Sequence, residues 1–239
     1  ALTDYTLARH FPNAEPAASP ALTLLREVAA GQGRLIALWQ QVGFIHGVMN
    51  TDNMLVSGET IDYGPCAFMD EYDPETVFSS IDRHGRYAYE NQPRIGEWNL
   101  ACLGRALVPI LGEGDRGGVE QAQAIIDSFV NDLTGHFHQG MAAKLGLQLS
   151  EGDEELIEDF LELLTKTHAD YTLALRRLTD LADPESEGAR IGDLFEFDEL
   201  FDPWLNRWRQ RTRAEDSLPS ERQALMRRLN PAFIPRNHL

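Results

Sequence analysis

The sequence predicts a mainly α-helical fold with one small β-hairpin, and three observations support this prediction. Apolar residues recur at three- and four-residue spacing over long stretches, which is the period of an amphipathic helix. Pieces of strand type, rich in apolar and β-branched residues, gather within residues 44–61. The 239 residues are 43% hydrophobic, which is enough to bury a substantial core.

The first expected helix covers residues 21–43. Its apolar stripe includes Leu25 and resumes at Ile36 and Trp39 after a weak patch at Gly31–Gly33.

A β-hairpin is expected directly after this helix. Ser57-Gly58 is a turn sequence, because glycine readily adopts the positive φ that tight turns need. The expected pieces of strand are 44–45, 54–56 and 60–61. Residues 62–93 then show no dominant period. A loop of about 30 residues is long for a compact domain, so a function or a mobile segment is the expected reason for it.

Six further helices are expected after this loop. Pro93 suits the first turn of a helix, where a missing N–H costs nothing. Ser150 with Asp153 is a capping signal, and Ser220 with Gln223 resembles a capping box. The expected ranges are 93–110, 118–145, 151–166, 168–182, 196–213 and 219–229.

The composition argues against two classes of partner. A net charge of −17 and a pI near 4.7 disfavour binding to nucleic acid or to an anionic membrane, because contacts with phosphate need a basic surface. An acidic surface can still hold a nucleotide when metal ions supply the positive charge.

The two cysteines, Cys66 and Cys102, are too few for a disulfide scaffold and indicate a reducing compartment. No run reaches the roughly 18 apolar residues of a membrane helix.

The stretch FIHGVMNTDNMLVSGETIDYG, which begins at Phe44, carries the candidate chemistry. His46 and Asn53 have the spacing of the H-x-D-x-x-x-x-N loop of kinase-like phosphotransferases. Asp62 follows in a DYG sequence, where such enzymes place an aspartate that binds magnesium near the phosphates. A hard divalent cation prefers oxygen ligands, and an amide oxygen with a carboxylate, completed by phosphates and water, would satisfy it. The spacing therefore predicts a metal site, although chance or another use of these residues also produces such a spacing.

The acid that a kinase loop carries at position 48 is replaced by Val48. Two interpretations follow from this replacement. Either the chain is a kinase-like protein without catalysis, or its chemistry has moved to the neighbouring Asp52.

Three longer strings carry a resemblance to a known family. HGVMNTDNM, TIDYGP and HGRYAYENQP closely resemble, in order and spacing, the selenoprotein O (YdiU-type) family of protein adenylyltransferases. The resemblance extends through nearly the whole chain and is most specific in residues 46–98. It implies a protein-kinase-like C-lobe with a helical C-terminal extension. The expected organisation is one domain over residues 1–239, with active-site loops at 44–93 and a helical region at 94–239.

The resemblance also implies an activity. The family binds ATP in a reversed orientation and transfers AMP, with Mg²⁺ or Mn²⁺, to Ser, Thr or Tyr hydroxyls of protein substrates. Position by position, it makes Asp52 the general base, Asn53 a metal ligand, and Asp62 a ligand of the metal and of ATP. Arg86 and Tyr87 are candidate contacts to nucleotide or substrate, or else anchors of the long loop. The expected location is a bacterial-type cytoplasm, or the mitochondrion in a eukaryote.

Some positions have a structural alternative or depart from the family. Asp52 could instead cap its loop by accepting backbone N–H groups. His46 is expected to be structural and to bond the backbone near the metal-binding turn, and Cys66 is expected to be a small packing residue. The family tends to have Phe-Gly where this chain has Cys66-Ala67, and Ser where it has Leu55. Both departures concern the geometry of the loops and not the proposed ligands.

The family's N-terminal lobe, with its glycine-rich loop and Lys–Glu ion pair, has no counterpart in these 239 residues. The chain alone is therefore expected to transfer little or no AMP. Two other functions stay open. One is a small-molecule kinase of the aminoglycoside phosphotransferase type, which Val48 opposes. The other is a non-catalytic nucleotide-binding pseudokinase that binds partners, which the retained Asn53 and Asp62 oppose.

Overall fold

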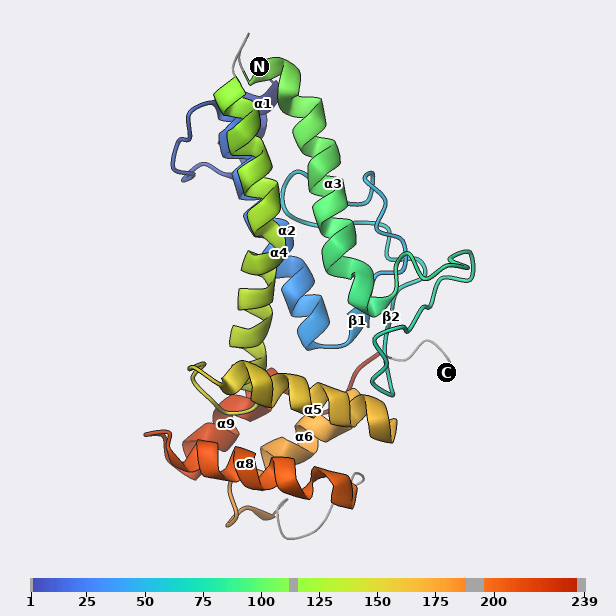
Figure 1. Ribbon diagram of the computed structural model, residues 1–239, viewed down its shortest axis with the longest axis vertical. Coiled ribbons are helices and arrows are strands. Elements are labelled where there is room, and N and C mark those ends of the chain that lie inside the picture. Colours follow the sequence, from blue (N-terminus) through green and yellow to red (C-terminus); the bar gives the residue numbers. More distant parts are fainter. Residues whose placement is uncertain (1, 112–115, 188–195, 236–239) are drawn as a thin grey trace. The chain divides into compact units, whose positions relative to one another are not determined.

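The computed structural model describes residues 2–111, 116–187 and 196–235. The described part is mainly helical, as predicted, and contains one two-stranded sheet (Figure 1). The chain forms two compact units. The first comprises residues 1–40, 45–66 and 77–136, and the second comprises residues 41–44, 67–76 and 137–239. No helix in the described ranges is both long enough and apolar enough to cross a membrane.

The helices are named as in Figure 1, and α4 contributes residues to both units. The first unit contains α1 (Leu2–His10), nearly all of α2 (Pro20–Gln41), α3 (Gln92–Leu107) and most of α4 (Arg116–Lys144). The second unit contains α5 (Asp153–Thr167), α6 (Tyr171–Leu181), α8 (Asp202–Arg213) and α9 (Pro219–Leu229). The strands are β1 (Phe44–Ile45) and β2 (Ala67–Phe68), and short 3₁₀ turns lie at Tyr89–Asn91, Val108–Ile110 and Glu199–Phe201.

Glycines allow α2, α3 and α4 to pack closely in the first unit. A Cβ atom added to Gly96 of α3 would lie 2.7 Å from Cδ1 of Ile36 and 3.1 Å from the ring of Phe129. A Cβ atom on Gly33 of α2 would lie 3.4 Å from the same phenylalanine ring. The glycine patch that weakens the helical pattern in the sequence is therefore part of a continuous helix, and it serves as a packing surface.

The expected turn at Ser57-Gly58 is confirmed. Gly58 has a φ of +83°, and the N–H of Leu55 donates to the carbonyl oxygen of Glu59 at 2.9 Å. Beyond this turn the two arms share a single bridge, Met54 with Thr60, so the strands expected at 54–56 and 60–61 do not form. The second arm turns away directly after Ile61, because Asp62 has a φ of +60°. On the turn side, the side-chain amide of Gln32 in α2 donates to the carbonyl oxygens of Leu55 and Glu59.

Two short elements were not predicted from the sequence. Helix α1 lacks a buried apolar stripe, since Leu2 and Tyr5 are exposed, so helical periodicity could not find it. Strand β2 lies inside the region expected to be a loop and is too short to show a period. The β1–β2 pairing continues into a hydrogen bond from the N–H of Met69 to the carbonyl oxygen of Gly43, at 2.9 Å.

The start of one helix and the cap of another also differ from prediction. Helix α8 begins at Asp202 and not at residue 196, because Pro203 fits only in the first turn. Helix α9 begins as expected, but its first turn is closed by the N–H of Leu218, which donates to the carboxylate of Glu221 at 3.3 Å. Gln223 does not cap this helix, because it is buried and donates to a backbone carbonyl of α6.

Aromatic rings form much of the core of the second unit. Trp204 and Trp208 of α8 stack with ring centroids 6.3 Å apart, and Phe160 of α5 lies 4.7 Å from the first of them. Both indole N–H groups have backbone acceptors. Trp204 Nε1 donates to Leu156 O at 2.8 Å, and Trp208 Nε1 donates to Leu145 O at 2.9 Å. Helix α8 is thereby joined both to α5 and to the end of α4.

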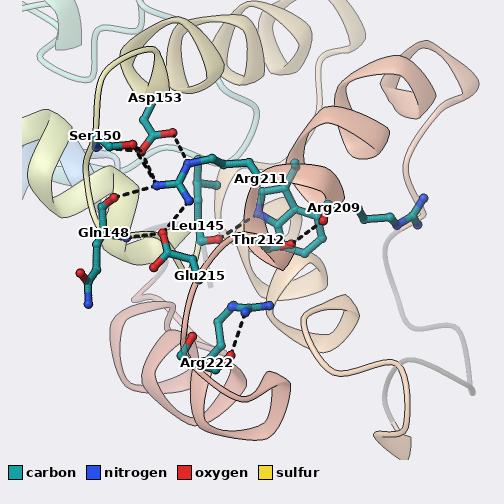
Figure 2. Close-up of polar contacts among 11 residues, drawn as sticks. Leu145, Gln148, Ser150, Asp153, Arg209, Arg211, Thr212, Glu215 and Arg222 are labelled. Carbon is teal, nitrogen blue, oxygen red and sulfur yellow. Dashed lines mark hydrogen bonds and ion pairs between the residues drawn. The ribbon is translucent and has the colours of Figure 1, made fainter.

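Arg211 of α8 fixes the connection between α4 and α5 (Figure 2). Its guanidinium donates to both carboxylate oxygens of Asp153, at 2.8 and 3.0 Å, and to the carbonyl oxygen of Gln148 at 2.9 Å. The N–H of Ser150 also donates to Asp153. This bond lies before the helix, because α5 begins at Asp153 with Gly152 at its N-cap and no side-chain cap, so the cap predicted at Ser150 is wrong. Burial alone would raise the pKa of Asp153, but the hydrogen bonds from Arg211 and Ser150 outweigh it and lower the pKa.

Replacing Arg211 by methionine is expected to lower the free energy of unfolding by about 3 kcal/mol at pH 7, because Asp153 is buried and would lose its charged partner. Urea titrations of both proteins measure this difference. The matched control is Arg207→Met on the same helix, whose ion pair with Asp159 is half exposed and whose loss should cost at most about 1 kcal/mol. The pKa of Asp153 is lowered in the folded state, so its stabilisation is present above the ordinary value of 3.8. The effect of Arg211→Met should therefore shrink as the pH falls below that value. Equal losses of unfolding free energy in Arg211→Met and Arg207→Met would show that the buried pair of Arg211 with Asp153 does not stabilise the fold more than the exposed pair does.

Candidate active site

His46 joins the two loops that carry the candidate residues. Its ring is fully buried, with centroids 5.6 Å from Trp39 and 5.2 Å from Tyr63. Nδ1 accepts a hydrogen bond from the N–H of Val48 at 3.3 Å, so the proton resides on Nε2, which donates to the carbonyl oxygen of Ile61 at 3.0 Å. The expectation that His46 bonds the backbone next to Asp62 is confirmed.

Burial lowers the pKa of His46, although the hydrogen bond to Ile61 and the charge of Asp62 oppose this shift. The neutral ring is therefore the form that suits the fold. Between the lowered pKa and the ordinary value of 6.5, the unfolded chain binds more protons than the folded chain. Stability due to His46 is thus present above pH 6.5 and is lost as the pH falls below it.

As the pH falls, the free energy of unfolding is expected to decrease more steeply in the wild type than in a His46→Gln variant. Unfolding free energies measured at pH 7.5, 6.5 and 5.5 should fall more in the wild type, by up to about 1.4 kcal/mol per pH unit for one proton. The other six histidines are common to both proteins and cancel in this comparison. If the unfolding free energies of the two proteins changed equally with pH, His46 would not be the source of this pH dependence.

Backbone contacts hold the two loops side by side. The N–H of Ile61 donates to the carbonyl oxygen of Asn53 at 3.0 Å, so Asp62 comes one residue after this hydrogen-bonded pair. Gly47 has a φ of +85°, and a Cβ atom there would lie 3.0 Å from the carbonyl oxygen of Pro65. A larger residue would be strained in its backbone and would push the loops apart.

The side chain of Asn53 has a fixed orientation. It is buried, and Nδ2 donates to the carbonyl oxygen of Val48 at 2.8 Å. The backbone N–H of Asn53 donates to the carbonyl oxygen of Asn50 at 3.0 Å. Because the amide nitrogen is used within the loop, the amide oxygen Oδ1 is the atom left to coordinate a ligand.

Asp62 is exposed and has a left-handed backbone, with a φ of +60°. Among the residues that the structure describes, only His168 shares this feature outside glycine. Aspartate tolerates such a conformation better than most residues, but the conformation still costs free energy and is frequent at functional sites. It turns the chain sharply directly after the residue that is bonded to Asn53.

Asp52 is exposed and precedes the buried Asn53. None of the described residues donates a hydrogen bond to its carboxylate, so the capping bonds of the structural alternative are not seen in this part of the chain. A cavity of about 440 Å³ lies beside this loop and is lined by the flanking residues Thr51 and Met54. Asp52 and Asn53 do not line that cavity.

Arg86 and Tyr87 lie where the long loop approaches the Asp52 loop. Tyr87 donates from its hydroxyl to Oδ1 of Asn50 at 2.5 Å. The Arg86 guanidinium is exposed and lies 4.9 Å from the ring centroid of Trp98 and 5.6 Å from that of Tyr87. Tyr87 therefore anchors the loop, while the donors of Arg86 remain on the surface.

Two positioning residues were not identified from the sequence. Gln92 and Asn99 are buried on α3, and both reach the loop that contains His46. Gln92 Oε1 accepts from the N–H of His46 at 3.0 Å, and Asn99 Nδ2 donates to the carbonyl oxygen of Met49 at 2.9 Å. The available signal was their spacing of seven residues, which puts two amides on one face of a helix.

The donor set fits a hard divalent cation. Asn53 offers an amide oxygen, and Asp62 offers a carboxylate on the neighbouring loop, which are the ligand types that Mg²⁺ and Mn²⁺ prefer. Within the described ranges, no group of three or more His, Cys, Asp and Glu residues gathers as a metal site. The two residues would therefore hold a cation together with oxygen atoms from a bound nucleotide and from water.

Comparisons with known proteins identify a family for the whole chain. The family described as "Protein adenylyltransferase SelO" matches residues 1–239. "Protein nucleotidyltransferase YdiU" of Rhizobium leguminosarum bv. trifolii (strain WSM2304) is 52% identical over 239 residues, which cover all of this chain and 48% of the relative. The proteins of the same name from Rhodopseudomonas palustris (strain BisB5) and Rhizobium etli (strain CIAT 652) are 52% and 51% identical, with 49% and 48% of their lengths covered. The chain thus spans about half the length of the curated relatives it matches.

Proposed function

The chain belongs to the SelO family of protein adenylyltransferases, and from this premise we propose that it supplies the catalytic and metal-binding residues for AMP transfer. The reaction is the attack of a Ser, Thr or Tyr hydroxyl of a protein substrate on the α-phosphorus of ATP. The bond between the α-phosphorus and the bridging oxygen breaks, and pyrophosphate leaves. In this proposal the first unit is part of the C-lobe of a kinase-like fold, and residues 1–239 act as one functional domain. An N-terminal lobe completes the nucleotide-binding site.

The observation that supports this proposal best is the hydrogen-bond network around His46. It joins the Asn53 loop to the Asp62 turn through the carbonyl oxygen of Ile61, and the N–H of Ile61 returns a bond to Asn53. Two oxygen ligands on separate loops must be held in a fixed relation before a cation arrives, since otherwise binding has to order them. Buried, neutral His46 and the amide bond of Asn53 provide that order.

The roles of the residues follow from their chemistry. A cation held by Asn53 and Asp62 would offset the negative charge that develops on the phosphates. Asp52, next to Asn53 and exposed, takes the proton of the attacking hydroxyl, whose pKa in water is far above 7. Val48 cannot perform this step, so the base lies four residues later in the loop than in the kinase pattern.

Labelled ATP tests the proposal. The test protein is a full-length family protein, meaning a chain that spans the whole length of the relatives and carries this segment. Radiolabel at the α-phosphate, but not at the γ-phosphate, should become covalently attached to protein. Transfer of the γ-label would instead support a kinase of the aminoglycoside phosphotransferase type. Magnesium-dependent binding of ATP without transfer of either label would support a pseudokinase. The 239-residue chain alone is expected to transfer little or no AMP.

A further inference from the structure

A second cavity, of about 810 Å³, lies in the first unit between residues 81–87 and the beginning of α3. Its charged lining residues are Asp82, Arg83, Arg86 and Arg94, and His84 also lines it. All three arginines are exposed at the surface of a chain whose net charge is −17. A local cluster of guanidinium groups on such an acidic chain needs an explanation other than general solubility.

The positive charge of this cavity is not neutralised from within. Asp82 is the one carboxylate in its lining, and both oxygens accept backbone N–H groups, from Arg86 at 2.9 Å and from Tyr87 at 2.7 Å. None of the three arginines forms an ion pair with a carboxylate of the described residues. The guanidinium donors therefore remain available, and guanidinium groups bind carboxylate or phosphate oxygens in pairs.

The wall of the cavity is aromatic and holds Arg86 in place. Its guanidinium lies 4.9 Å from the ring centroid of Trp98, which is 49% exposed, and a cation above a ring is held by the ring's charge distribution. Ile81, which is 79% exposed, adds an apolar surface. A volume of this size suits a ligand much larger than one phosphate ion, since cavities of about 300–1,000 Å³ enclose drug-sized molecules.

The cavity is connected to the candidate active site through one residue. Asn50 accepts the hydroxyl of Tyr87 with its side chain, and it accepts the N–H of Asn53 with its backbone carbonyl. A ligand on Arg86 would therefore lie next to the loop that carries the proposed base and metal ligand.

We propose that this cavity binds an acidic segment of the acceptor protein, close in sequence to the hydroxyl that receives AMP. This inference rests on the proposed function. Carboxylate side chains would pair with Arg83, Arg86 and Arg94, and neighbouring apolar side chains would pack on Trp98 and Ile81. The overall negative charge of the chain opposes an acidic partner only weakly at this range, because physiological salt screens charges beyond about 8 Å. Nucleic acid fits less well, since it needs a basic surface that extends over many phosphates.

Direct binding tests the proposal without any need for AMP transfer. The probe is a fluorescent peptide with a central serine flanked by glutamates, and its control replaces every glutamate by glutamine. Fluorescence anisotropy with the 239-residue chain should show salt-sensitive binding of the glutamate peptide alone.

The double variant Arg86→Gln/Arg94→Gln should weaken this binding by at least about tenfold, as expected for the loss of two charge-assisted contacts. The control variant is Arg34→Gln, an exposed arginine of α2 that does not line the cavity, and it should bind as the wild type does. Equal binding of both peptides, equal binding by the double variant, or displacement of the peptide by millimolar inorganic phosphate would overturn the proposal.

Kinetics in the full-length family protein provide the second measurement. The double variant should raise KM for the glutamate peptide and leave kcat and the KM for ATP unchanged, because it removes binding and not chemistry. A lower kcat with both peptides would mean that the arginines only support the loop through Tyr87, and it would overturn the inference. If the wild-type protein modified no acceptor at all, the proposed function would fail, while the anisotropy result would still decide whether the cavity prefers acidic peptides.

Discussion

Replacing Asp62 by asparagine in the full-length family protein is expected to abolish metal-dependent binding of ATP and, with it, AMP transfer. The carboxylate is the charged ligand of the proposed pair, and a neutral amide binds a divalent cation far more weakly. Loss of electrostatic stabilisation at a phosphoryl centre should reduce the rate by about 10²- to 10³-fold. Transfer from α-labelled ATP and the thermal shift produced by ATP with Mg²⁺ or Mn²⁺ measure the two effects.

Asparagine is the informative substitution at this position because of the backbone. Asp62 has a φ of +60°, which asparagine and glycine adopt readily and which alanine adopts at a cost of about 1 kcal/mol. Asp62→Asn and Asp62→Gly should therefore lose activity while their unfolding temperatures without ligand stay near that of the wild type. Asp62→Ala should lose both activity and some stability. A metal-dependent thermal shift that persists in the asparagine variant would show that the cation, if it binds, is held by other groups.

The elements that could be predicted are those that bury an apolar stripe. Helices α2, α4 and α5 lie within a few residues of the expected ranges, since their periodic apolar residues are buried in the core. Helix α1 and strand β2 escaped prediction because one is largely exposed and the other is only two residues long. Local composition carries no signal for such elements.

The candidate site also has features that the sequence predicts and features that it does not. Spacing and family resemblance point to the identities of Asp52, Asn53 and Asp62, and their roles remain proposals. The contacts that hold the loops in place could not be predicted, because they join residues far apart in the chain. The side chain of Gln92 meets the backbone of His46 across 46 positions, and that of Asn99 meets the backbone of Met49 across 50. A sequence shows which residues have amides, but only the fold shows which backbone group each amide reaches.

The replacement of Asp52 by asparagine should separate chemistry from binding. Asp52 is exposed, and its carboxylate accepts no hydrogen bond from the described residues, so the isosteric amide should leave the loop and the proposed ligand Asn53 in place. A general base contributes about 10² to 10⁴-fold to a rate. We therefore expect kcat for AMP transfer to fall within this range, while the thermal shift by ATP and metal stays close to that of the wild type.

The pair Asp52→Asn and Asp62→Asn forms a matched comparison, since each variant removes one carboxylate of the same type from the same region. If Asp52 is the base, its loss reduces transfer and spares binding, whereas the loss of Asp62 removes both. A weakened response to ATP in both variants would mean that Asp52 acts as a further ligand, because a group that only receives a proton in the transition state does not contribute to ground-state binding. Full AMP transfer by Asp52→Asn would mean that another group is the general base. Val48 could not be that group, because its side chain has no atom that accepts a proton.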